Sequence, residues 1–219
     1  MKLTREGIAV IEGDAYLSQW IIDQGRLDVA AEELEKYREY CNDGVVMDVG
    51  ASLGDTAATF SSMAYKVHAF EPNPPTFECL AHNMAAYKNV TIYPVGLGDI
   101  DRQVKLIEDR HNIGASRLTN EFGSIPVTSL DAVNKVLQMD YLDFLKIDAE
   151  GWEPLILDGG VKTIMKLRPV MLVEVNTWPL GEMGYRPDDI WDRLSMMKYW
   201  FERFDGPYGD VLCIPREKV

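Results

Sequence analysis

The stretch Val45-Val46-Met47-Asp48-Val49-Gly50-Ala51-Ser52-Leu53-Gly54-Asp55 decides the fold of this chain. Its first five residues form an apolar run that suits a strand buried on both faces of a sheet. Gly50 follows at once, and residues 54–64 then have the pattern of a helix. A strand, a small turn and a helix in this order predict a ligand site at the carboxyl end of the first strand of an α/β domain.

Strands and helices alternate along the rest of the chain. The pattern predicts strands over 66–70, 90–95, 144–147 and 169–175, helices over 75–87, 129–139, 152–166 and 187–200, and a terminal antiparallel hairpin of 201–204 with 210–214. Repeated β–α units imply an α/β fold with a mostly parallel sheet and helices on both faces.

The N-terminal residues have a different pattern. Residues 14–41 have helical spacing, which is interrupted at Gly25 and ended by Asn42-Asp43-Gly44. We therefore predict a small helical N-terminal cap over 1–43 and one domain over 44–219.

Composition narrows the range of partners. The 219 residues carry a net charge of −13, which repels nucleic acid phosphates, so we expect no nucleic acid partner. The three cysteines form no metal-binding or redox motif, so free thiols in a reducing compartment are expected. The first residues lack an apolar signal core, and no apolar run approaches the roughly 20 residues that span a bilayer. A cytoplasmic protein without a membrane partner is predicted, and a homo-oligomer is left open.

The expected cofactor site begins in the turn after the first strand. Gly50 has no Cβ, so a ligand can approach the backbone, and the following residues keep the turn small. Glu71 ends the second strand about 20 residues later, the spacing of an acid that accepts hydrogen bonds from ribose hydroxyls. An adenine ring is expected beside Gly96. The predicted cofactor-binding residues are Asp48, Gly50, Ala51, Ser52, Gly54, Glu71, Pro72, Asn73, Gly96 and Asp148.

An ordered series of motifs runs through about residues 44–176 of the chain. The most specific is Leu145-Lys146-Ile147-Asp148-Ala149-Glu150-Gly151-Trp152-Glu153. Earlier members of the series are Asp48–Asp55, Ala69–Pro74, Leu80–Asn83 and Val127–Asp131; Leu157–Gly159 and Arg168–Val175 follow. This series resembles the FkbM family of S-adenosylmethionine-dependent methyltransferases. The resemblance implies a class I methyltransferase fold, S-adenosylmethionine as cofactor, and methylation of a hydroxyl oxygen on a sugar or small-molecule acceptor. Ser52 stands where many members have Asn, and Ala149 where Val is common.

Four acids follow the fourth and fifth strands, beside the expected reacting methyl group. We expect catalytic roles for Asp148, Glu150 and Glu174, as a general base and as contacts to the acceptor hydroxyl, and an acceptor contact for Glu153. Alternatively, Asp148 or Glu150 caps the next helix and Glu153 favours its dipole. A third interpretation is a divalent metal bound by Asp148, Glu174 and Asn176. The preferred prediction contains no metal.

Residues outside these acids complete the predicted acceptor site. His111 is a candidate base in the polar insert, or simply a solvated side chain, and Asn112 and Ser116 are candidate acceptor contacts. Trp20 and Trp178 can form walls that stack on a sugar ring, or can pack as ordinary core residues. The glycine-containing segment 178–184 is interpreted as a mobile loop over the site.

The function predicted is therefore S-adenosylmethionine-dependent O-methylation of a sugar or small molecule. A nicotinamide-dependent oxidoreductase is an alternative, because it shares the glycine turn and Glu71, although the full G-x-G-x-x-G pattern is absent. A non-catalytic S-adenosylmethionine-binding module is the other alternative. The sequence does not identify the acceptor.

Overall fold

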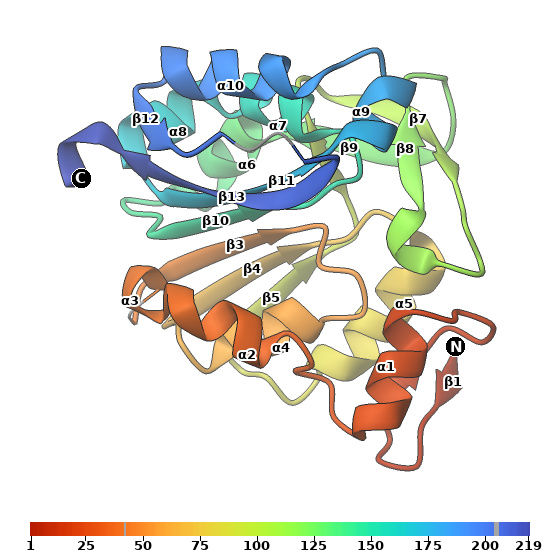
Figure 1. The fold of residues 1–219 in the computed structure, drawn as a ribbon. Coiled ribbons are helices and arrows are strands. Elements are labelled where there is room, and N and C mark those ends of the chain that lie inside the picture. The colour runs from red at the N-terminus through yellow and green to blue at the C-terminus, as the bar shows by residue number, and fades with distance from the viewer. Residues whose placement is uncertain (42, 204–205) are drawn as a thin grey trace.

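A seven-stranded sheet separates two layers of helices in the computed structural model, which describes residues 1–41, 43–203 and 206–219 (Figure 1). The strand order is β12-β13-β11-β10-β3-β4-β5. In chain order, the strands are β3 (Val45–Val49), β4 (Lys66–Phe70), β5 (Val90–Tyr93), β10 (Phe144–Ile147), β11 (Val170–Asn176), β12 (Tyr199–Phe201) and β13 (Tyr208–Pro215). The first five of these are parallel, and β13 pairs antiparallel with both β11 and β12. The predicted mostly parallel sheet and terminal hairpin are confirmed, although the predicted strand end at Phe204 lies outside the described residues.

The strand order reverses beside β3. From β3 the chain runs outward through β4 and β5, then returns to place β10 and β11 on the other side of β3. Ligands of such sheets bind beyond the carboxyl ends of the strands at this switch point. The fully buried pattern of β3 agrees with its central position.

Helices cover both faces of the sheet, as expected. One face carries α4 (Asp55–Ser61) and α5 (Pro74–Met84); the other carries α6 (Leu130–Leu137), α7 (Glu153–Gly159), α8 (Val161–Leu167) and α10 (Pro187–Met196) (Figure 1). The single helix predicted over 152–166 is wrong, because the chain breaks it into α7 and α8 at Gly160. The last residue of α7, Gly159, must be a glycine, because a Cβ there would overlap the carbonyl oxygen of Gly98.

The N-terminal segment packs against the α4–α5 side of the molecule (Figure 1). It contains β1 (Lys2–Leu3), β2 (Ala9–Val10), α1 (Leu17–Gln24), α2 (Ala31–Leu34), the 3-10 helix η1 (Glu35–Tyr37) and α3 (Arg38–Cys41). Gly25 ends α1 in the left-handed conformation, as its position predicted. The side chain of Asn83 in α5 exchanges two hydrogen bonds with the backbone of Ala9. The segment is therefore not helical throughout, and Asn42 lies outside the described residues.

A second sheet follows β5, in the order β6-β9-β7-β8. It consists of β6 (Gly96–Gly98), β7 (Arg102–Ile107), β8 (Arg117–Thr119) and β9 (Ile125–Ser129), with the 3-10 helix η2 (Ile113–Ala115) between β7 and β8. The segment predicted as a mobile loop forms α9 (Thr177–Glu182) for most of its length, capped by the side chain of Asn176. A last 3-10 helix, η3 (Arg216–Lys218), closes the chain.

Two global properties bear on the sequence predictions. All three cysteines are buried free thiols. Among the helices of the described residues, none has the length and apolar character needed to cross a membrane.

The turn after β3 touches the end of β10 through its backbone. A Cβ atom on Gly50 would overlap the carbonyl oxygen of Asp148, and Gly50 has φ +83°. The Gly50 amide meanwhile donates to the carbonyl of Phe70 at the end of β4. Glycine is therefore required here so that three strand ends can meet, in addition to any approach by a ligand.

Replacement of Gly50 by alanine should destabilise the protein strongly. The positive φ and the overlap with Asp148 together predict a loss of about 3 kcal/mol or more in the free energy of unfolding. Urea denaturation followed by circular dichroism measures the change. Gly181→Ala is the matched control, because Gly181 lies in α9 with open space around its Cβ position, and its replacement should be neutral or stabilising. Equal stability of the Gly50→Ala variant and the wild type would contradict the contact.

Candidate functional site

A cavity of about 280 Å³ opens at the carboxyl edge of β3, β4, β10 and β11. Among the residues predicted for the site, those that line it are Gly50, Ser52, Glu71, Pro72, Asn73, Gly96, Ser116, Asp148, Glu150 and Glu174. These residues come from turns that are far apart in the sequence, so the switch point brings them together. The lining also includes apolar side chains from the second sheet and η2, among them Leu106, Ile113 and Leu118.

Glu71 holds the turn after β3 in place. Its Oε2 accepts a hydrogen bond from the Ser52 amide at 3.0 Å, and its Oε1 accepts one from the Asn73 amide at 2.8 Å. The side chain is buried, and burial raises the pKa of Glu71 to about 7. Each carboxylate oxygen has a second lone pair, so the group can also accept hydrogen bonds from a vicinal diol in the cavity.

Two lining groups next to Glu71 extend its polar surface. Ser52 has φ +47°, a left-handed conformation that is uncommon for residues other than glycine and several-fold enriched in Asn. The Oδ1 atom of Asn73 is buried without a hydrogen-bond partner within the described part of the chain. An unpaired buried amide oxygen on a cavity wall is available to a donor on a ligand.

Asp48 lies beneath the cavity floor and does not line it. It is fully buried, accepts a hydrogen bond from the Thr56 hydroxyl at 2.6 Å and lies 3.9 Å from the ammonium of Lys146. Lys146 also donates to Asp148 at 2.7 Å. Burial alone would lower the pKa of Lys146, but the charges of Asp148 and Asp48 outweigh burial and raise it, so the ammonium stays charged. Direct contact between Asp48 and a cofactor, as predicted, does not fit this burial.

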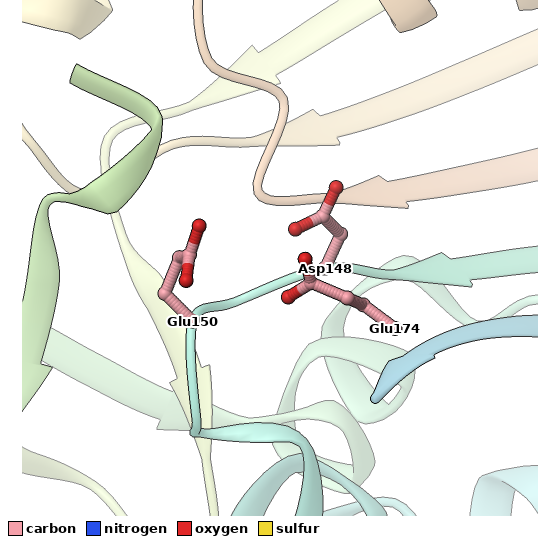
Figure 2. Close-up of side chains that lie close together, drawn as sticks. All are labelled: Asp148, Glu150 and Glu174. Atoms are coloured by element: carbon pink, nitrogen blue, oxygen red, sulfur yellow. The ribbon is translucent and has the colours of Figure 1, made fainter. Parts of the chain in front are cut away.

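Three carboxylates converge on one point of the cavity. Asp148 and Glu150 follow β10, Glu174 lies in β11, and each offers an oxygen within 4.8 Å of the others (Figure 2). Burial, followed by the charges of the neighbouring acids, raises the pKa of Glu174 and of Glu150. The alternative in which Asp148 or Glu150 caps the next helix is wrong, because α7 has no side-chain cap at its first turn.

Glu153 does not contact the cavity, contrary to the prediction of an acceptor contact. It is 1% exposed, and its carboxylate accepts hydrogen bonds from the backbone amides of Ala149 and Gly151. These bonds fold the chain after β10 back on itself and hold Glu150 at φ +49°. Glu153 therefore positions the loop that carries Asp148 and Glu150.

The polar insert contributes fewer groups than expected. Ser116 lines the cavity, whereas His111 and Asn112 do not. His111 is exposed and contacts the ring of Tyr16 edge-on at 6.1 Å between ring centroids. The catalytic role predicted for His111 is not supported by this position, because the side chain is solvated on the outside of the insert.

Neither predicted tryptophan lines the cavity. Trp20 lies on α1 with 46% of its surface exposed, and another residue of that helix, Leu17, reaches the cavity instead. Trp178 lies in the first turn of α9 and stacks under the guanidinium of Arg117, which lies 4.5 Å from the ring centroid and does line the cavity. Trp178 therefore borders the cavity mouth through Arg117.

Three residues that line the cavity had no role predicted from the sequence: Lys146, Arg117 and Tyr208. Lys146 lies two residues before Asp148, and two positions along a strand share a face, so this pairing could have been found. Arg117 comes from the insert and Tyr208 from β13, which pairs with β11, and both reach the cavity through tertiary packing.

Comparison with known families matches this chain to the Methyltransferase FkbM domain over residues 48–201. A curated relative, hexuronic acid methyltransferase AglP of Haloferax volcanii, is 30% identical over 183 residues, covering 80% of this chain and 70% of AglP.

Solved structures agree on the fold. The FkbM methyltransferase of Methylobacillus flagellatus aligns with TM-score 0.52 and 18% identity, over 79% of this chain and 43% of that one. This chain therefore spans less than half of that protein. A TehB-like S-adenosylmethionine-dependent methyltransferase of Corynebacterium glutamicum aligns with TM-score 0.53 and 10% identity, over 91% and 94% of the two chains. The predicted class I methyltransferase fold is confirmed.

Replacement of Ser52 by asparagine should stabilise the protein. Asn tolerates the left-handed conformation better than Ser, so we expect the free energy of unfolding to rise by about 0.5–1 kcal/mol. Chemical denaturation at fixed pH measures this difference. Ser52→Ala is the control, because it keeps the Cβ and its strain and should give no gain; a stabilised alanine variant would assign the effect to another cause.

Proposed function

The chain belongs to the FkbM family of S-adenosylmethionine-dependent methyltransferases, and from this premise we propose that it methylates a hydroxyl oxygen of a sugar acceptor. The observation that carries the proposal is the arrangement of one cavity. It is lined both by the carboxylate of Glu71, which can accept hydrogen bonds from a diol, and by the three converging carboxylates Asp148, Glu150 and Glu174.

The part of the cavity around Glu71 fits the chemistry of an adenosyl group. Glu71 offers free lone pairs to ribose hydroxyls, and the buried Oδ1 of Asn73 receives no hydrogen bond from any residue that the structure describes. The apolar surface of Leu97, Leu106 and Leu118 suits an adenine ring. When bound, S-adenosylmethionine supplies an electrophilic methyl group on a sulfonium and leaves as S-adenosylhomocysteine.

The three converging carboxylates suit a hydroxyl acceptor. The carboxylates of Asp148, Glu150 and Glu174 accept hydrogen bonds from hydroxyl groups and orient the acceptor oxygen toward the methyl group. As the new O–CH₃ bond forms and the C–S bond breaks, the hydroxyl O–H bond also breaks, and a cluster carboxylate takes the proton. Glu150 is the cluster member that we assign as the proton acceptor, because it lines the cavity and no ion pair among the described residues commits its carboxylate to a cation.

A sugar is the favoured acceptor class for two reasons. AglP, the curated relative, is a hexuronic acid methyltransferase. Several hydroxyl groups on one ring also match several acids at one point, and the Arg117–Trp178 pair beside the cavity supplies a cation for an acidic sugar. The alternative of a nicotinamide-dependent oxidoreductase is wrong, because the family match and the relatives are methyltransferases.

A panel of methyl glycosides of glucuronic acid, galacturonic acid and neutral hexoses tests the acceptor class. The purified protein and S-adenosylmethionine should yield S-adenosylhomocysteine and a methyl ether on a ring hydroxyl, located by NMR. Glu150→Gln should lower kcat about 100-fold, because proton transfer contributes on this scale, and should leave cofactor binding unchanged.

Glu121→Gln is the matched control, since Glu121 is an exposed acid paired with Lys105 outside the cavity. A methyl ester on the uronic carboxylate would contradict hydroxyl methylation. Cofactor binding without turnover on any member of the panel would instead favour a non-catalytic binding module.

Cofactor affinity should depend on pH through Glu71. Because the pKa of Glu71 is raised to about 7, the carboxylate is ionised above this pH and protonated below it. The ionised form accepts hydrogen bonds more strongly, so the Kd for S-adenosylhomocysteine should rise as pH falls from 8 to 6. Calorimetric titrations at pH 6, 7 and 8 measure this trend.

Glu71→Gln should weaken binding about tenfold or more at pH 8 and remove most of the pH dependence, since a hydrogen bond to a charged group contributes about 1.5–3 kcal/mol. A pH trend that persists in the glutamine variant would assign the titration to a different group.

A further inference from the structure

The three converging carboxylates of the cavity have the geometry of a cation site. Asp148, Glu150 and Glu174 each contribute an oxygen, all within 4.8 Å of one another, and their side chains face a common point (Figure 2). Two of them follow β10 and the third lies on the neighbouring strand, so the sheet itself sets their spacing. Carboxylate oxygens are the ligands that hard divalent cations prefer.

Glu174 supplies a second and independent indication of a ligand site. It is only 3% exposed, and its Oε2 has no hydrogen-bond partner in the described ranges of the chain. Two other buried acids of this region differ from it, because Glu153 and Glu71 each accept hydrogen bonds from two backbone amides. A buried carboxylate without a partner is unfavourable unless a ligand completes it.

The two cations among the described lining residues pair with acids other than Glu174 and Glu150. Lys146 donates to Asp148 at 2.7 Å and lies 3.9 Å from Asp48, so its charge is directed to these two acids. Arg117 is directed toward Glu182, at 3.2 Å. No hydrogen bond or ion pair from either cation to Glu174 is present among the described residues, and Glu150 likewise lacks a paired cation.

We propose that Asp148, Glu150 and Glu174 bind one divalent cation of the Mg²⁺ or Mn²⁺ type. One oxygen of Asp148 accepts from Lys146, which leaves its other oxygen for the metal. Water and the acceptor hydroxyl complete the coordination, and the cation lowers the pKa of that hydroxyl. The proposal that a cation binds does not depend on the proposed function, whereas the contact between the cation and the acceptor rests on the proposed methylation.

Asn176 is not a ligand in this arrangement, although the sequence had suggested it together with Asp148 and Glu174. Its Oδ1 accepts the Trp178 amide at 3.4 Å and caps α9. Glu150 takes its place because the left-handed turn held by Glu153 directs it into the cavity.

Titration of the chelator-treated full chain with Mn²⁺ tests the site. Binding is measured by calorimetry and by the decrease in the electron paramagnetic resonance signal of free Mn²⁺. One equivalent should bind with a Kd below about 1 mM. Glu174→Gln should weaken binding at least tenfold and still bind S-adenosylhomocysteine, which shows that the variant is folded. Glu121→Gln should bind Mn²⁺ like the wild type.

Absence of stoichiometric Mn²⁺ binding, or equal binding by the Glu174→Gln variant, would overturn the proposal. Mn²⁺ binding without methylation of the sugar panel would leave the cation site standing and reject only the acceptor assignment. Full methylation by chelator-treated protein would reject the contact between cation and acceptor.

Discussion

The backbone contact between Gly50 and Asp148 is the constraint on which the cavity depends. The absence of a side chain at Gly50 lets the carbonyl of Asp148 approach the turn after β3, while the Gly50 amide reaches back to Phe70. Three strand ends are thereby joined at the switch point of the sheet. As a result, Glu71 and Asp148, which lie 77 positions apart in the chain, line one cavity.

Buried carboxylates in this region divide according to the partners they have. Glu153 accepts only backbone amides of its own loop, and Asp48 is held by Thr56 and Lys146 beneath the floor. Glu71 has amide partners and spare lone pairs, whereas Glu174 has no hydrogen-bond partner at Oε2 among residues 1–41, 43–203 and 206–219. The hydrogen-bond partners of each acid therefore indicate its role. Acids that are held by groups of the protein outside the cavity shape it, and acids that line the cavity with free lone pairs remain available to a cofactor, an acceptor or a cation.

Much of the fold could be predicted from the sequence because the signals are local. The apolar run of β3 and the bounds of β4 and β10 follow from periodicity, and the positions of Gly50 and Glu71 mark the strand ends. The roles of individual side chains could not be predicted in the same way. Glu150 and Glu153 are three residues apart and chemically alike, yet a left-handed turn sends one into the cavity and the other into the protein. Likewise, the position of Arg117 depends on how the second sheet packs against α9, which no local pattern records.

The central claim is that one cavity binds both the cofactor and the cation beside the acceptor. A crystal structure of the protein in complex with S-adenosylhomocysteine and Mn²⁺ tests this claim most directly. The ribose hydroxyls are expected within hydrogen-bonding distance of the Glu71 carboxylate, with the sulfur atom directed toward Asp148 and an anomalous manganese peak between Asp148, Glu150 and Glu174. A cofactor bound away from Glu71, or bound with its sulfur atom directed away from the three acids, would contradict it.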